Sequence, residues 1–132
     1  MKKLLSFILA SFFLLLFFSY SYSSSKEVIL YFFWADGCPH CAKQKEFLNI
    51  LKKKYPQLHI KDYEVWYNPA SRQLLQTMAK AYNINPTGVP VTFIGNKALV
   101  GFSEKVANEI ESVLRQCLKS LCEDPLYYKN NH

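Results

Sequence analysis

The chain begins with an apolar run that differs from every pattern after it. Residues 4–18 are almost entirely apolar; two lysines precede them, and a stretch of serine and tyrosine follows. A charged start, an apolar middle and small residues at the end are typical of a secretory signal. We therefore predict a signal peptide over residues 1–23, cut after Ser21 or Ser23. The alternative is an uncleaved membrane anchor, because the run is close to the minimum of about 17 residues for a span.

Four short apolar segments in the rest of the chain predict β-strands. Residues 28–34 form a continuous apolar run, which suits a central strand covered on both faces. Residues 58–66 indicate a second strand. Two further runs, residues 91–94 and 97–100, flank a Gly-Asn pair that is a two-residue hairpin signal.

Three amphipathic segments predict α-helices between and after these strands. The first begins at Pro39 and ends before Pro56, the second is capped by Asn68, and the third is capped by Ser103. The order of elements is therefore β-α-β-α-β-β-α. Strands joined through a helix are parallel, and the hairpin adds an antiparallel edge. We expect one α/β domain over residues 24–122, with a mixed central sheet and helices on both faces.

Composition adds few constraints to this scheme. The chain of 132 residues is long enough for one domain. Without the predicted signal it holds 14 basic and 10 acidic residues. The lysines are scattered over polar helix positions, which argues against a nucleic-acid site. Residues 123–132 have no apolar period, and we expect a loose tail there.

The candidate chemistry is concentrated in four cysteines, which form two closely spaced pairs. Cys38 and Cys41 stand where the first strand turns into the first helix. At a helix N-terminus, free backbone N–H groups and the helix dipole favour a thiolate. The thiolate is the nucleophile of disulfide exchange, which makes Cys38 the expected attacking residue. Cys41 lies one turn inside the helix, close enough to attack a mixed disulfide and release the product.

The two residues between these cysteines tune the predicted site. Pro39 suits the first position of the helix. His40, as a donor or a cation near Cys38, would stabilise the thiolate and make the disulfide a better oxidant.

Two motifs carry a resemblance to a known superfamily. The segment Phe-Trp-Ala-Asp-Gly-Cys-Pro-His-Cys, residues 33–41, resembles the active-site stretch of thioredoxins, and its Pro-His pair resembles that of DsbA-type proteins. The segment Gly-Val-Pro-Val-Thr-Phe-Ile-Gly, residues 88–95, resembles the loop that holds a cis-proline in thioredoxin folds. The likeness covers roughly residues 27–118. The chain is identified as a member of the thioredoxin-like superfamily, similar to short exported glutaredoxin- or thioredoxin-like domains without the helical insertion of DsbA.

The resemblance implies the minimal thioredoxin fold and assigns two further residues to the site. Pro90 would be cis and face the cysteines, and Val89 would offer its backbone to an extended substrate. The trans form of a Val-Pro peptide bond is only slightly more stable than the cis form, so a cis bond at this position has a small free-energy cost. A trans proline in an edge strand is the alternative. Similar domains include some that are fused to DsbD/CcdA-type membrane electron carriers, which makes such a carrier an expected partner.

One position departs from the superfamily pattern. Thioredoxin and DsbA carry a buried acid six residues before the first cysteine, as the proton acceptor of the second cysteine. This sequence has Phe32 at that position. Asp62 and Glu64 share one face of the second strand, and either is a candidate proton relay. Ordinary exposed strand charges are the alternative.

The second cysteine pair, Cys117 and Cys122, is open to several interpretations. Five residues apart in an unbroken helix, their Cα atoms would be about 8.6 Å apart, whereas a disulfide needs roughly 4.4–6.8 Å. Either the helix ends between them, near Lys119 and Ser120, or they are not bonded. A structural disulfide, a second redox pair that exchanges electrons with Cys38–Cys41, and two independent thiols all remain possible.

The sequence as a whole predicts a thiol–disulfide oxidoreductase outside the cytoplasm, periplasmic or otherwise extracytoplasmic. It acts on protein thiols and disulfides, and it needs no cofactor and no metal beyond the redox-active disulfide Cys38–Cys41. It meets a membrane only if its N-terminal segment is retained. The alternatives are a zinc site made by the four cysteines, a thiol-based metal chaperone, and a binding module without catalysis. Whether it oxidises, reduces or isomerises disulfides is left open.

Overall fold

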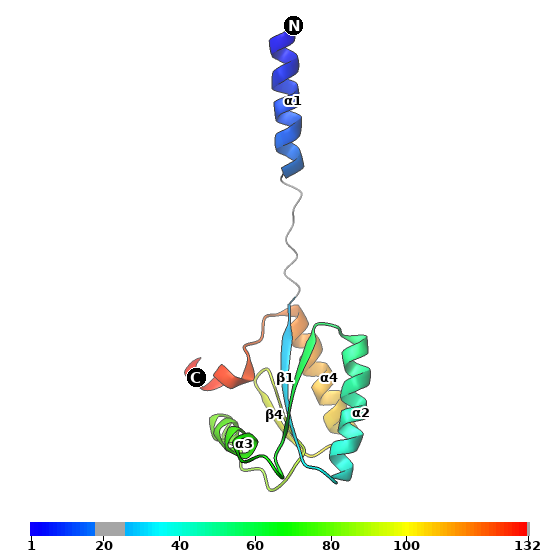
Figure 1. Cartoon of the computed structure of the whole chain (residues 1–132), viewed down its shortest axis with the longest axis vertical. Helices are drawn as coiled ribbons and strands as arrows, with labels where there is room; N and C mark the ends of the chain where they lie inside the picture. The colour runs from blue at the N-terminus through cyan, green and yellow to red at the C-terminus, as the bar shows by residue number, and fades with distance from the viewer. Residues whose placement is uncertain (18–25, 132) are drawn as a thin grey trace.

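The computed structural model describes residues 1–17 and 26–131 (Figure 1). The N-terminal segment forms helix α1 (Lys2–Phe17), which stands apart from the other elements, and the side chains of residues 1–12 are exposed. No helix in the described part of the chain is long and apolar enough to cross a membrane. The predicted cuts after Ser21 and Ser23 lie outside the described residues. The choice between a signal peptide and an anchor therefore stays a prediction.

Four strands form one mixed sheet in the order β2-β1-β3-β4. β1 pairs parallel with β2 and antiparallel with β3, and β3 pairs antiparallel with β4. β1 is central and almost wholly buried, as its continuous apolar sequence predicts. The strands are β1 (Val28–Trp34), β2 (Leu58–Glu64), β3 (Val91–Ile94) and β4 (Lys97–Val100).

Three helices cover the two faces of this sheet (Figure 1). They are α2 (Pro39–Lys54), α3 (Pro69–Ala81) and α4 (Glu104–Lys119). Alternate side chains of β1 point to opposite faces. Leu30 and Phe32 pack in one core cluster with residues of α2 and α4, and Tyr31 and Phe33 pack in a second cluster with residues of α3. The predicted fold class, a minimal thioredoxin fold with helices on both faces, is confirmed.

Strand β2 ends two residues earlier than the sequence pattern predicts. The carboxylate of Glu64 accepts hydrogen bonds from the backbone N–H groups of Trp66, at 2.7 Å, and Tyr67, at 2.8 Å. These bonds bend the chain after Glu64. Residues 65–66 are apolar like the strand before them, but they are not part of it.

The C-terminal segment is ordered by contacts with the α3 face. Residues Pro125–Asn131 form the 3-10 helix η1, which lies against α3 and β1. The ring of Tyr128 stacks on that of Tyr82 with the centroids 4.2 Å apart, and Pro125 is buried. The sequence pattern indicated only a loose tail, because single aromatic contacts made by so short a helix leave no period.

Candidate active site

The candidate site begins at the turn between β1 and α2. Gly37 has a φ of +74°, in the left-handed region that favours glycine, and it redirects the chain after Trp34. Cys38 then caps α2, and Pro39 is the first helical residue. The backbone N–H of Cys41 donates a hydrogen bond to Sγ of Cys38 over 3.2 Å. The sulfur of Cys38 therefore takes the position of an N-cap acceptor, where unpaired N–H groups and the helix dipole stabilise negative charge.

The two cysteines of this turn are bonded to each other and differ in exposure. Cys38 and Cys41 form a disulfide. Cys38 is partly exposed, whereas Cys41 is 1% exposed and belongs to the core cluster under α2 and α4. An incoming sulfur can therefore reach Cys38 but not Cys41. His40 is exposed on the first turn of the same helix.

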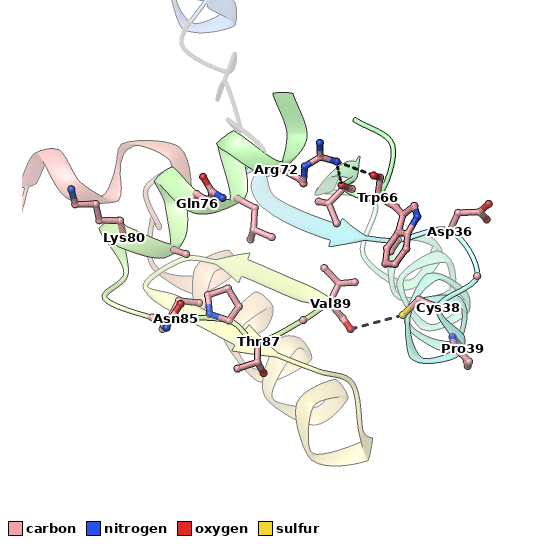
Figure 2. A pocket seen from close by; sticks show the side chains of 18 of the residues that line it. Asp36, Cys38, Pro39, Trp66, Arg72, Gln76, Lys80, Asn85, Thr87 and Val89 are labelled. Atoms are coloured by element: carbon pink, nitrogen blue, oxygen red, sulfur yellow. Dashed lines mark hydrogen bonds between the residues drawn. The ribbon is translucent and has the colours of Figure 1, made fainter. Parts of the chain in front are cut away.

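A segment 51 residues further along the chain meets this turn. The Val89–Pro90 peptide bond is cis, and Sγ of Cys38 lies 3.9 Å from the carbonyl oxygen of Val89 (Figure 2). Pro90 is buried, and its carbonyl accepts a hydrogen bond from the N–H of Gly101. The structure thus has the cis bond that the resemblance implies, with Val89 directly beside Cys38.

A groove of about 1330 Å³ extends from Cys38 between α3 and residues 83–89. Figure 2 shows Asp36 near the Cys38 end and Lys80 at the far end. Much of the wall is apolar, with Leu75, Ala79 and Ile84 among its residues. The guanidinium of Arg72 lies at one edge of the groove (Figure 2) and donates hydrogen bonds to the carbonyl oxygens of residues 65 and 66, both 2.8 Å away. A groove of this length beside the exposed sulfur has room for an extended peptide segment.

The two acids predicted as proton relays have different surroundings. Asp62 pairs with Phe32 across the β1–β2 ladder, and the indole N–H of Trp34 donates to its carboxylate over 3.0 Å. Nζ of Lys45 lies 2.9 Å from the centre of the Trp34 ring. A smaller pocket of about 320 Å³ is lined by Trp34, Lys45 and both cysteines of the turn. Asp62 is exposed and does not line this pocket; its carboxylate is connected to it through the hydrogen bond to the Trp34 indole.

Glu64 instead holds together the loops beside the site. Besides Trp66 and Tyr67, the N–H of Asp36 donates to its carboxylate over 3.3 Å. Partial burial raises the pKa of Glu64, but these backbone N–H groups outweigh burial and hold the pKa below its usual value. A carboxylate that accepts so many backbone bonds is a poor proton acceptor, so its position favours a structural role over a relay.

The sequence interpretation missed a buried polar pair on the α2 side of the sheet. Nε2 of Gln44 donates a hydrogen bond to Oγ1 of Thr92 over 2.5 Å, and both side chains are 0% exposed. Gln44 lies three residues after Cys41 on α2, and Thr92 lies opposite Phe32 in the β1–β3 ladder. The signal in the sequence was a single glutamine in the stripe that Cys41, Leu48 and Leu51 otherwise make apolar.

The second pair of cysteines lies at the other end of β3. Helix α4 ends at Lys119, and Cys117 and Cys122 form a disulfide across that end. A Cβ placed on Gly95 would lie 3.1 Å from Sγ of Cys117. Gly95 follows β3, whereas Val89 precedes it; six extended residues span about 20 Å. The four cysteines therefore do not converge on one zinc ion, and the two disulfides do not touch.

These features define the class of the protein. A sheet of this order, a Cys-x-x-Cys disulfide at the start of the helix after β1, and a cis-proline facing it make the chain a member of the thioredoxin-like superfamily. Within it, the family model for glutaredoxin matches residues 28–99, which are 72 of the 132 residues, and the chain belongs to the glutaredoxin family. The predicted superfamily is confirmed.

Three solved structures share the fold. The structure assigned as thiol:disulfide interchange protein DsbE from Chlorobium tepidum has a TM-score of 0.54 at 14% identity and covers 71% of this chain and 82% of its own. A thioredoxin-like protein from Clostridium perfringens has a TM-score of 0.51 at 24% identity, with coverage of 71% and 73%. A periplasmic thioredoxin-like protein from Salmonella enterica has a TM-score of 0.51 at 15% identity, with coverage of 74% and 87%. No curated protein sequence is significantly similar to the chain. A thioredoxin-like fold with a Cys-x-x-Cys disulfide is typical of thiol–disulfide oxidoreductases.

Proposed function

We propose that this protein is a thiol–disulfide oxidoreductase that works outside the cytoplasm and exchanges disulfides with protein thiols through Cys38 and Cys41. One observation carries the proposal: the partly exposed sulfur of Cys38 caps α2 and lies 3.9 Å from the carbonyl of Val89, while its bonded partner Cys41 is buried. The arrangement gives one accessible sulfur and one sealed sulfur, which is what a two-step exchange requires.

The exchange runs through a mixed disulfide. When the protein oxidises a substrate dithiol, a substrate thiolate attacks Cys38, and Cys41 leaves and takes up a proton. The second substrate thiolate then attacks the substrate sulfur of the mixed disulfide and releases Cys38 as a thiolate. The substrate loses two electrons and the Cys38–Cys41 disulfide gains them. Reduction of a substrate disulfide is the reverse sequence, in which Cys41 attacks Cys38 to release the reduced substrate.

The substrate is an extended protein segment that lies along the groove beside Cys38. The backbone of Val89 offers an edge to which such a segment can add as a short strand. The apolar wall made by Leu75, Ala79 and Ile84 favours a substrate with apolar side chains near its cysteine. No cofactor takes part, since the electrons reside in the Cys38–Cys41 disulfide.

We further propose that a signal peptide over residues 1–23 precedes the working domain, which begins at residue 24 and includes η1. The domain exchanges its electrons with a membrane carrier of DsbD/CcdA type. The apolar N-terminal run supports export. Expression in a secreting bacterium followed by mass spectrometry tests this: a mature chain beginning after Ser21 or Ser23 supports it. An intact chain in the membrane fraction supports the anchor, and an intact chain in the cytoplasm contradicts export.

Trapping separates the two cysteines. We expect Cys41→Ser to accumulate a mixed disulfide with oxidised insulin, because the Cys38 thiolate can still attack an insulin disulfide while the cysteine that would release the product is lost. Cys38→Ser should trap nothing, since the buried Cys41 is out of reach. The control is a double Cys117→Ser and Cys122→Ser variant, which should exchange like the wild type. Trapping by Cys38→Ser alone would reverse the roles, and no exchange by the wild type in either direction would favour a non-catalytic binding module.

A further inference from the structure

The buried pair of Gln44 and Thr92 has no role in the exchange described so far. Gln44 projects from α2 and Thr92 from β3, and the hydrogen bond between them joins the helix that carries Cys41 to the strand that follows the cis-proline. Neither side chain has any exposed surface. Polar groups in such positions are costly unless every donor and acceptor is paired.

One atom of this pair is not paired. Oε1 of Gln44 is buried and has no hydrogen-bond partner among residues 26–131. A buried carbonyl oxygen without a donor destabilises the state in which it occurs. Because the Cys38–Cys41 disulfide is formed, this is a property of the oxidised protein.

Reduction of the disulfide creates a hydrogen-bond donor on the same face of α2 as Gln44. Residues three apart on a helix lie on the same face, so Gln44 is a neighbour of Cys41. Cys41 is 1% exposed and buried in the α2 and α4 cluster together with Phe32. As a disulfide, Cys41 has no proton to donate, whereas as a thiol it has one S–H donor. The side chain of Phe32, which lies opposite Thr92, offers no acceptor for it.

We propose that Gln44 is a positioning residue of the redox site: its Oε1 accepts a hydrogen bond from the Cys41 thiol in the reduced protein, and Thr92 holds the amide in place. The proposal rests on the proposed function, because it requires that Cys38–Cys41 cycles between its two states. A partner dithiol supplies two electrons and two protons and becomes a disulfide. The Cys38–Cys41 bond breaks, one proton stays on Cys41 next to Gln44, Cys38 is released as a thiolate, and the other proton goes to solvent.

This contact acts on only one of the two redox states. It stabilises the reduced protein, so it raises the reduction potential and makes the disulfide a stronger oxidant. It also keeps the proton on Cys41, which leaves Cys38 as the thiolate that attacks. A glutamine cannot take the proton itself at neutral pH, so it orients the thiol and does not act as a base.

The test compares the reduction potential of the wild type with that of Gln44→Met. Methionine fills a similar volume without an oxygen acceptor. Both proteins are equilibrated with mixtures of reduced and oxidised glutathione, and the fraction of free Cys38 and Cys41 is measured by alkylation and mass spectrometry. We expect the equilibrium constant for reduction to fall about threefold to tenfold, which is about 15–30 mV. Gln73→Met, at an exposed position of α3, is the matched control and should leave the constant unchanged.

A second readout separates this role from ordinary packing. A packing defect lowers the stability of both redox forms equally. Gln44→Met removes the hydrogen bond to Thr92 in both redox forms, but the proposed contact with Cys41 exists only in the reduced form. The variant should therefore lower the stability of the reduced protein in urea more than that of the oxidised protein. Gln44→Glu keeps an oxygen acceptor and should not lower the potential. If Gln44→Met fails to fold, Thr92→Val removes the anchor of the amide and should lower the constant in the same direction by a smaller factor.

The outcomes distinguish the inference from the function on which it rests. A wild type that cycles with glutathione and a Gln44→Met variant with the same equilibrium constant would overturn the role of Gln44 alone. Equal destabilisation of both redox forms would do the same. A wild type whose Cys38–Cys41 pair never becomes reduced or re-oxidised would overturn the proposed function.

Discussion

His40 and Cys38 share the first turn of α2, and the histidine is exposed there. A donor or cation at this place can stabilise only the reduced form, in which Cys38 is a thiolate. We expect His40→Ala to lower the reduction potential by about 30 mV for each pKa unit by which the Cys38 thiolate is destabilised. Equilibration with glutathione buffers measures the change. His59→Ala is the control, since His59 is also exposed but pairs with Glu27 near the start of β2.

Asp62 stays the candidate proton relay for Cys41, through the pocket that Trp34 lines. We expect Asp62→Asn to slow release of the mixed disulfide near neutral pH and to leave alkylation of Cys38 nearly unchanged. The defect should shrink at high pH, where hydroxide removes the proton directly. Stopped-flow measurement of release across pH checks this. Equal release rates for the variant and the wild type would exclude the relay.

Glu64 lies on the same face of β2 as Asp62 and serves as the comparison. We expect its substitution to lower the stability of the folded protein. Its pKa in the folded protein is below its usual value because backbone N–H groups donate to the carboxylate. The charged form therefore contributes stability above the usual pKa of a glutamate, about 4.3, and this contribution is lost as the pH falls through the folded-state pKa. Glu64→Gln should unfold more easily than the wild type at pH 7 and equally easily at strongly acidic pH, with its release rate unaffected.

Among single residues, those in short sequence motifs could be predicted from the sequence, whereas the buried pair of Gln44 and Thr92 could not. Cys38, Cys41, Val89 and Pro90 belong to short motifs whose chemistry depends on neighbouring residues in the chain. The relation of Gln44 to Thr92 depends on how α2 is rotated above the sheet, which a helical period defines only to within a residue. A single glutamine in an apolar stripe is therefore indistinguishable from a surface residue until the helix is packed.

At the scale of elements, the β3–β4 turn and the end of α4 depend on each other. Gly95 has a φ of +52°, and a Cβ there would lie 3.1 Å from Sγ of Cys117. Gly101 also has a positive φ, +80°, but a Cβ there would have no neighbour within 4 Å. We expect Gly101→Ala to destabilise the protein by about 1 kcal/mol from backbone strain and Gly95→Ala by more, because the sulfur must also move.

Chemical unfolding of the two alanine variants measures this difference. In a Cys117→Ala and Cys122→Ala background the excess cost of Gly95→Ala should disappear, since the smaller side chains vacate the space. If the excess persists in that background, the contact between the turn and the disulfide is not its cause.

The sequence predicted the elements whose hydrophobic pattern extends over many residues. The apolar run of β1, the hairpin signal and the three amphipathic stripes each sum over many residues, and each appears in the structure near its expected place. The end of β2 and the whole of η1 instead depend on a few contacts with distant residues, the carboxylate of Glu64 and the ring of Tyr82. Such contacts leave no pattern along the chain.

For the whole molecule, the placement of the two disulfides at opposite ends of β3 argues against direct electron transfer between them. We expect the double Cys117→Ser and Cys122→Ser variant to release mixed disulfides from Cys38 at the wild-type rate. Its η1 helix should exchange amide hydrogens faster, because the disulfide no longer holds Cys122, in the segment that leads into η1, against α4. Slower release by the variant would restore the hypothesis of a second redox pair.

The central place of β1 also has a consequence for the proposed export of the chain. β1 is the first strand to be synthesised, but it pairs with residues 58–64 and 91–94, which are made much later. A nascent chain therefore has partners for both edges of its most apolar strand only after residue 94, when most of the domain has been translated. A polypeptide of this topology stays unfolded during much of its synthesis. A translocation channel that binds its first residues early would therefore receive an unfolded chain.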